Sequence, residues 1–143
     1  MLVRVLVAGV VGAIAFFLLG WVVWGILLHG YFDSTMTATA KSVMSSEPDI
    51  LPLALAEIVF GVLFAYIFDK WASISTFVGG AIAGATLMFG ISLGSDLQMS
   101  AFFKDMHVGS PWVPMIVDVL AAVFVGVITG GLIGQVIGMM RKE

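Results

Sequence analysis

Four long apolar stretches, separated by shorter polar segments, dominate the chain. They cover residues 5–28, 51–68, 74–93 and 113–140. A helix needs roughly 20 apolar residues to cross about 30 Å of hydrocarbon, so stretches of this length can span a membrane. None of them alternates between apolar and polar residues in the way that a membrane β-strand does. The pattern therefore predicts four transmembrane helices.

The first stretch has some features of a secretory signal, because Arg4 precedes it and Ala38-Thr39-Ala40 looks like a cleavage site. The apolar core of a signal is usually about 7–15 residues long, and this run is about twice that length. The candidate cleavage site also lies well beyond the end of the run. We therefore expect a true membrane helix at this position.

Backbone groups in lipid must be hydrogen-bonded within each span, which favours helices. The predicted fold class is an all-α polytopic membrane protein, in which a single integral membrane domain (1–143) forms an up-down-up-down bundle of four transmembrane helices. Lys and Arg are enriched on the cytoplasmic side of membrane proteins. We expect both termini in the cytoplasm and the chain in the inner, cytoplasmic membrane. Four basic residues lie on the terminal side and two on the other: Arg4, Lys70, Arg141 and Lys142 against Lys41 and Lys104.

The chain resembles two helix pairs in tandem. The first and third stretches share the pattern Gly-Ala-Ile-Ala, at residues 12–15 and 80–83. The second and fourth stretches each begin near a proline and then reach an acid. Two-span units in tandem give a parallel repeat. Chance similarity among apolar helices is the alternative.

Composition supports a membrane protein and excludes several other classes. The chain is 61% apolar and 10% charged, with a mean hydropathy of +1.15, whereas soluble domains are nearer about half apolar and a quarter charged. A net charge of −3 argues against a nucleic-acid binder, which needs clustered basic residues. Without cysteine, the chain has no disulfide, thiolate metal site or iron–sulfur cluster.

Small residues recur at every fourth position in the fourth stretch and, more briefly, in the third. Such ridges let helix backbones approach closely in lipid, where no hydrophobic force drives helices together. We expect this ridge to pack either inside the monomer or against another copy or another membrane subunit. Its residues are Ala122, Gly126, Gly130, Gly134 and Gly138, with Gly80 and Gly84 in the third stretch.

Glu57 and Asp118 are acids inside apolar stretches. At about 1.5 Å per residue, both lie roughly 7–10 Å below the same membrane surface. Intramembrane acids are costly unless they are paired, protonated or hydrated, and they usually face a bundle interior or a cavity. We expect both side chains to point into the bundle and to meet in one polar pocket, which could exchange protons or bind a cation. The alternative is a neutral, hydrogen-bonded acid that fixes helix register.

Other polar and aromatic side chains are expected to approach this pocket from the same side of the membrane. Trp21 and Trp24 are three residues apart on one helix face and could line it. His29 or His107 could ligate a pigment or metal, but the chain has no HExxH motif or i,i+4 histidine pair, so we expect no metal and no cofactor. The remaining candidates for the pocket are His29, Asp33 and Asp96, with Ser92, Ser95 and Gln98 as hydrogen-bond partners.

No motif indicates an enzyme, since the chain contains neither a Walker loop nor a dinucleotide-binding glycine fingerprint. We expect a non-enzymatic membrane protein, a subunit or scaffold whose partners are the lipid bilayer and either further copies of itself or other membrane subunits, not nucleic acid. The alternative is a small proton- or cation-coupled transporter or channel that uses Glu57 and Asp118.

Three segments carry a resemblance to a bacterial family: LGWVVWGILLHGYF, PLALAEIVFGVLFAYIF and IVDVLAAVFVGVITGGLIG. In their order and hydropathy they resemble the small four-span membrane proteins grouped as domain of unknown function 1761. The resemblance covers most of the chain and implies a four-span fold. It implies no activity and no functional residue, because none is established for that family.

Overall fold

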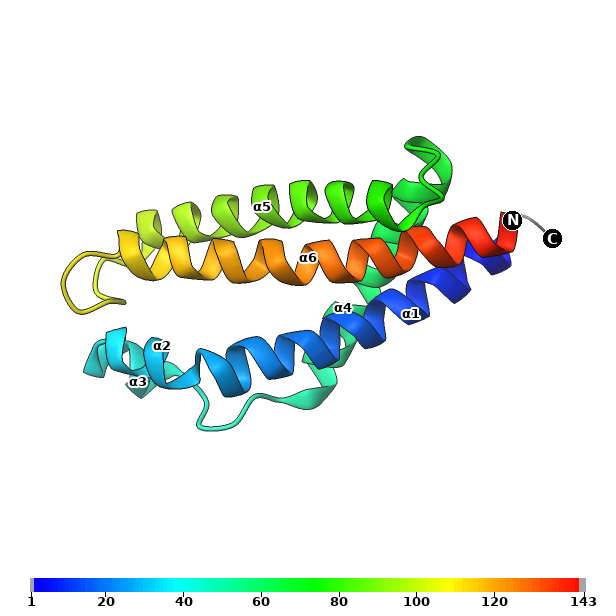
Figure 1. The fold of residues 1–143 in the computed structure, drawn as a ribbon. Helices are drawn as coiled ribbons and strands as arrows, with labels where there is room; N and C mark the ends of the chain where they lie inside the picture. Colours follow the sequence, from blue (N-terminus) through cyan, green and yellow to red (C-terminus); the bar gives the residue numbers. More distant parts are fainter. Residues whose placement is uncertain (1, 142–143) are drawn as a thin grey trace.

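Four long helices dominate the computed structural model, which describes residues 2–141 (Figure 1). Each is long and apolar enough to cross a membrane, and the described residues contain no strand. The predicted all-α polytopic fold is therefore confirmed. The first two spans each continue into a π-helix, named η. The spans are α1 (Leu2–Gly20) with η1 (Trp21–Leu27), α4 (Ile50–Tyr66) with η2 (Ile67–Trp71), α5 (Phe77–Phe102) and α6 (Trp112–Arg141).

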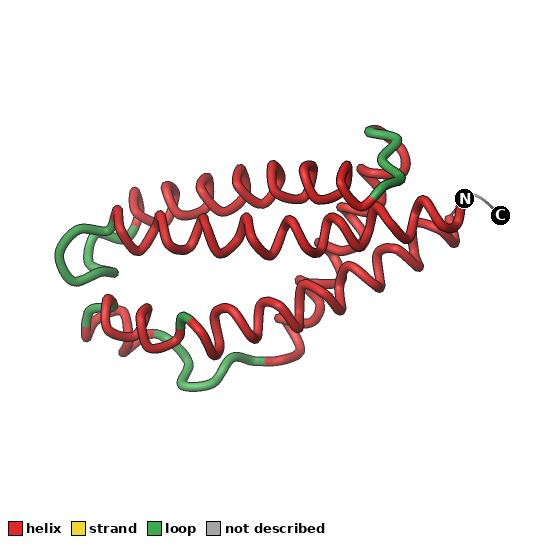
Figure 2. Tube along the Cα trace, viewed as in Figure 1, coloured by secondary structure: helices red, strands yellow, loops and turns green. Residues whose placement is uncertain are grey.

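The two ends of the bundle differ in what they carry (Figure 2). One end, here called the loop end, holds the short helices α2 (His29–Thr35) and α3 (Ala38–Val43) together with the loop 103–111. The other, called the terminal end, holds the two ends of the described chain and the short turn 72–76. Successive spans run in opposite directions between these two ends, which gives the predicted up-down-up-down order.

The third span is longer than the sequence pattern predicts. The apolar stretch ends at Leu93, whereas α5 continues to Phe102. Most of the added residues are polar or small and none is a proline, so the helix has no reason to stop where its hydropathy falls. This extension brings two further turns of polar side chains to the loop end.

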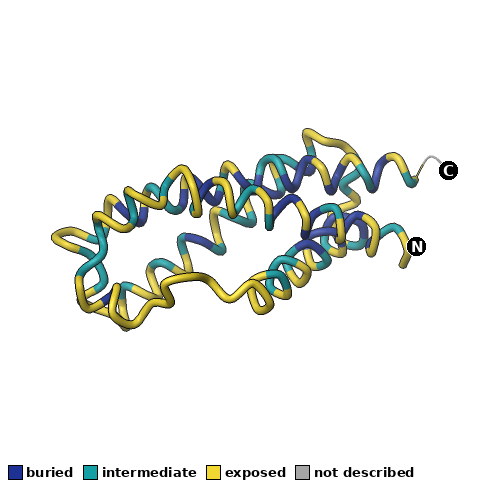
Figure 3. Tube along the Cα trace, turned by 90° about the horizontal axis from the view of Figure 1, so that it is seen from below, coloured by how far each residue is buried: buried dark blue, intermediate teal, exposed yellow. Residues whose placement is uncertain are grey.

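The spans pack as an open series, not as a closed square. The central helix is α6, with α5 packed along one side and α1 along the other; α4 packs mainly on α1 and contacts α6 only slightly. The buried residues of α4 and η2 all lie between Gly61 and Asp69, so the loop-end half of α4 stands apart from the core (Figure 3). Both consecutive pairs, α1–α4 and α5–α6, are antiparallel, and their origin in a duplication stays a prediction.

Large apolar side chains cover the outside of the bundle. Ile82 on α5 is 65% exposed and Leu120 on α6 is 63% exposed, and they are two of many such residues. Soluble monomers rarely expose contiguous apolar patches larger than a few hundred Å². The outer surface therefore suits contact with lipid, as a multi-pass membrane protein requires.

The helices α5 and α6 touch through their backbones along the small-residue ridge. A Cβ added to Gly80 would overlap the carbonyl oxygen of Gly130, and one added to Gly84 would overlap that of Gly126. The ridge of α6 is thus covered by α5 within this chain. The other ridge residues of α6 are buried as well: Ala122, Gly134 and Gly138.

The apolar core lies where α1, α4 and α6 meet in the terminal half of the bundle. Phe64 and Phe68 are fully buried there, as is Ile133 of α6. The rings of Phe16 and Phe64 pack edge to face with their centroids 5.3 Å apart. Close contact is again made possible by glycine, because a Cβ on Gly61 would overlap the backbone of α1.

We predict that Gly84→Val disrupts the α5–α6 contact, because branched carbons have no room beside the carbonyl of Gly126. Overpacking against backbone should lower the free energy of unfolding by about 3 kcal/mol. Gly20→Val on α1 is the control, since a Cβ there meets no atom within 4 Å, and its effect should stay below about 0.5 kcal/mol. Circular dichroism during thermal unfolding in detergent measures both, and equal destabilisation would contradict the packing described here.

Candidate functional site

A polar cluster centred on Asp118 lies in the loop-end half of the bundle, between η1, α5 and α6. The indole Nε1 of Trp24 donates a hydrogen bond to Asp118 Oδ1 at 2.7 Å. The hydroxyl of Ser92, which is buried on α5, donates to Asp118 Oδ2 at 3.0 Å. Donors from two other spans therefore replace the water that this carboxyl group gives up inside an apolar bundle.

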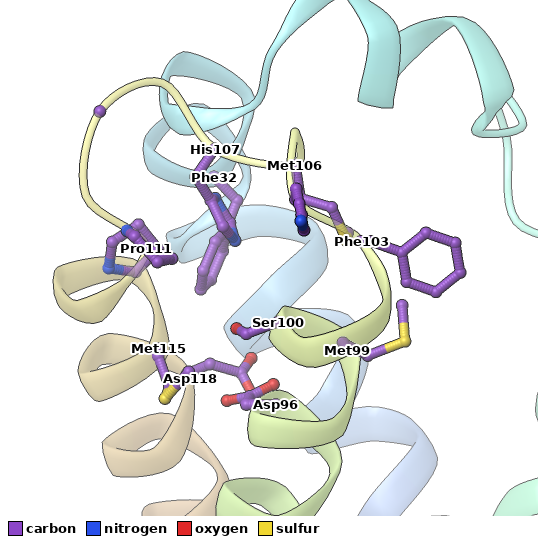
Figure 4. A pocket seen from close by; sticks show the side chains of 13 residues that line it. Phe32, Asp96, Met99, Ser100, Phe103, Met106, His107, Pro111, Met115 and Asp118 are labelled. Carbon is purple, nitrogen blue, oxygen red and sulfur yellow. The ribbon is translucent and has the colours of Figure 1, made fainter.

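Asp96 lies beside Asp118, one helical turn along α5 from Ser92 (Figure 4). Its Oδ2 atom is buried and has no hydrogen-bond partner among the described residues. Two neighbouring carboxylates that are poorly hydrated repel each other when both are ionised. A proton or a cation placed between them would remove that repulsion.

The two carboxyl groups line a cavity of about 270 Å³, here called the acid cavity, which extends toward the loop 103–111. Met99 and Met115 are among its apolar lining residues, and His107 lies at its loop side (Figure 4). The Nδ1 atom of His107 is buried and, in the part of the chain that is described, has no partner. The cavity thus combines two acids with a histidine that retains hydrogen-bonding capacity and with Lys104 at its loop side.

Glu57 does not join this cluster, so the expectation that it meets Asp118 in one pocket is wrong. It lines a second, larger cavity of about 710 Å³ between α1, η1 and α4. The reason is that α4 packs on α1 only through its terminal-end half, which leaves Glu57 in the half that stands apart. Trp24 belongs to both regions, because its side chain lines the Glu57 cavity while its Nε1 reaches Asp118.

The remaining candidates divide between the cavities and the surface. His29 and Trp21 line the same cavity as Glu57, away from the acid cavity. Asp33 lines neither cavity, so its predicted place in the polar pocket is wrong. It lies on α2 outside the four spans, where it is exposed and pairs with Lys41 of α3 at 3.0 Å. The short helices of the loop end thus turn this acid toward solvent.

The hydrogen-bond partners expected for the two acids are only partly found. Ser92 bonds Asp118, whereas Ser95 and Gln98 are exposed on α5. Within residues 2–141, His29 forms no ion pair with Glu57.

Asp69 is a buried acid that the sequence patterns do not predict. Its side chain is 1% exposed at the terminal end, and its Oδ1 atom lies 2.8 Å from Arg4 Nη2 and 3.1 Å from Arg141 Nη2. Lys70 Nζ lies 3.4 Å from its Oδ2 atom. The sequence does contain a pattern that indicates this cluster. An acid stands next to a lysine at the end of a span, on the side where basic residues from two other spans gather. The cluster joins α1, η2 and α6 by charge.

We predict that Asp69→Asn destabilises the fold, because three cations would then surround a neutral side chain. Removing one partner from a buried ion cluster costs about 3 kcal/mol. Asp33→Asn is the matched control, since Asp33 pairs with one exposed lysine and such pairs contribute less than about 1 kcal/mol. Unfolding midpoints in detergent measure the difference. A cost for Asp69→Asn no greater than that for Asp33→Asn would show that the cluster does not stabilise the fold.

Comparison with known proteins finds no match to this chain by family model, by curated sequence or by solved structure. The resemblance to the four-span family with domain of unknown function 1761 therefore stays a prediction.

Proposed function

We propose that this chain is a small membrane transporter or channel that binds a proton or a small cation at the Asp96–Asp118 pair. The observation that carries the proposal is the buried Oδ2 atom of Asp96, which has no partner among the described residues and lies beside a second carboxyl group in a cavity. A transient positive charge is the partner that such an arrangement favours.

A purely structural role accounts for only part of this site. Asp118 with its two donors is enough to tie η1, α5 and α6 together. Asp96 places a second carboxyl group beside the first, which adds a free-energy cost of repulsion and desolvation. Its buried oxygen receives no hydrogen bond from the described residues in return. Ionisable residues within membrane spans usually mark ion or proton pathways for this reason.

The charge distribution supports an orientation with the acid cavity on the outer side of the cytoplasmic membrane. Arg4, Lys70 and Arg141 lie at the terminal end, and Lys41 and Lys104 at the loop end. The excess of basic residues favours a cytoplasmic terminal end. We therefore propose that the loop end faces outward and that ions enter there.

Passage to the other side requires a second arrangement of the helices. Toward the terminal end, α5 and α6 are in backbone contact at Gly80 and Gly84. An ion that leaves Asp118 in that direction needs α5 and α6 to separate, or α1 to move against α6. The proposal therefore includes two conformations that open the same pair of acids to opposite sides.

We predict that Asp118→Asn and Asp96→Asn each lower proton or cation flux at least tenfold in proteoliposomes, because each removes a negative charge from the binding pair. A pH-sensitive dye trapped in the vesicles reports proton flux, and replacement of Na⁺ by K⁺ or an impermeant cation identifies the ion. Glu47→Gln is the control, since Glu47 is an exposed acid in the loop before α4. Flux in the double variant equal to that of the unmodified chain would exclude the acid pair as the pathway.

Association with further membrane helices is the second candidate function, and one observation favours it. The ridge on α6 is covered by α5, but α5 has another face of small residues at Gly90 and Gly94. A Cβ at either position meets no atom within 4 Å. Thr86 and Gln98 continue the same four-residue spacing and are exposed. A helix of another copy or of another subunit would fit against this face.

We predict that the chain migrates on blue-native gels in mild detergent as a species larger than one 15.2 kDa chain. Gly90→Leu should shift the chain toward the monomer, because a large side chain would hold a neighbouring helix away. Gly20→Leu is the control, since Gly20 on α1 also has no neighbour within 4 Å but lies outside the α5 face. Migration as a monomer at every protein concentration, with no copurifying protein, would count against association.

A further inference from the structure

The cavity that holds Glu57 plays no part in the proposed ion site. It measures about 710 Å³ and lies between α1, η1 and the loop-end half of α4. Binding sites for small organic molecules are usually about 300–1,000 Å³ in volume and mostly apolar, with a few polar groups. We call it the aromatic cavity, after the rings that line it: Phe16, Phe17, Trp21, Trp24 and Phe60.

Its polar lining is sparse and carries one acid. Of the residues that the structure describes, Glu57 is the only acid that lines the cavity, and no lysine or arginine among them does so. Among the described residues, Glu57 forms no ion pair and accepts no side-chain hydrogen bond. His29 is the other ionisable residue of the lining. A carboxylate in such a place lacks a counter-charge, which a ligand could supply.

The aromatic walls favour the same sign of charge as the acid. The faces of tryptophan, tyrosine and phenylalanine rings attract cations, and the attraction grows when water is excluded. Trp21 and Phe17 stack with their centroids 6.4 Å apart, which makes a continuous aromatic surface on one wall. The cavity therefore offers ring surfaces for an apolar body and a carboxylate for a positive charge.

The position of the cavity limits what can enter it. It lies between helices that separate toward the loop end, and Met44, Ser45, Ser46 and Pro48 of the loop before α4 contribute to its lining at that end. A ligand reaches it from the bilayer or from beneath this loop. A small hydrated ion gains little from so much apolar surface, whereas an amphiphilic molecule gains both burial and charge pairing.

We propose that the aromatic cavity binds a lipophilic organic cation, a molecule with an apolar body and one positive charge that rests against Glu57. An acyl chain of a lipid would fill the apolar space equally well, but it would leave Glu57 without a counter-charge. The site is separate from the Asp96–Asp118 pair, and the proposal does not depend on ion transport.

Two probes of the same shape and opposite charge test the proposal. The purified chain in nanodiscs is titrated with tetraphenylphosphonium and, separately, with tetraphenylborate, by isothermal titration calorimetry, and the heat from protein-free nanodiscs of the same lipid is subtracted. We expect saturable binding of the cation and at least tenfold weaker binding of the anion. Equal binding of both probes would overturn the proposal and identify a non-selective apolar cavity such as one occupied by lipid.

Three variants assign the binding to Glu57. Glu57→Gln should weaken binding of the phosphonium at least tenfold, whereas Glu57→Asp should retain most of it, because the charge remains. Asp96→Asn should leave binding unchanged, because Asp96 lines only the acid cavity and forms no hydrogen bond with Trp24, and this variant separates failure of this proposal from failure of the proposed ion site. Circular dichroism checks that each variant is folded. Unchanged binding in a folded Glu57→Gln variant, or no binding by the unmodified chain, would overturn the proposal.

Discussion

Backbone contact between α5 and α6 fixes the register on which the acid site depends. Gly84 lies against Gly126, with a second glycine pair one turn closer to the terminal end. Moving eight residues along α5 and eight residues back along α6 leads to Ser92 and Asp118, which are joined by a hydrogen bond. A slip of one residue would rotate a side chain by about 100° around its helix. The glycines therefore position polar groups that lie two turns away from them.

The sequence predicts the number of spans, their order and the small-residue ridge, but not which helices touch. In lipid, the core and the surroundings are both apolar, so the apolar pattern does not mark the buried face. Glu57 and Asp118 have similar predicted depths, and depth says nothing about direction around the bundle. The separation of α4 from the core at the loop end places them in different cavities. Depth alone offers Ser92, Ser95 and Gln98 equally as partners, whereas the register of the glycines, followed along both helices, pairs Ser92 with Asp118.

Three of the four acids inside the spans lie in three different environments. Asp69 is surrounded by basic side chains from three spans and is suited to hold helix ends together. Asp118 accepts hydrogen bonds from neutral donors and has a second acid beside it. Glu57 lies among aromatic rings with neither kind of partner among the described residues. An acid that finds few hydrogen-bond donors or counter-charges within its own chain binds a proton, ion or ligand more readily.

The side chain of Trp24 takes part in both cavities, which links their binding energetics. Its ring is part of the wall of the aromatic cavity, and its Nε1 donates to Asp118. Any molecule whose binding changes the position of this ring changes the hydrogen bonding of the carboxyl group behind it. Thermodynamic linkage then requires the converse, by the same factor: protonation or ion binding at Asp118 alters the affinity for that molecule. Through this single indole, binding in one cavity would change the affinity of the other.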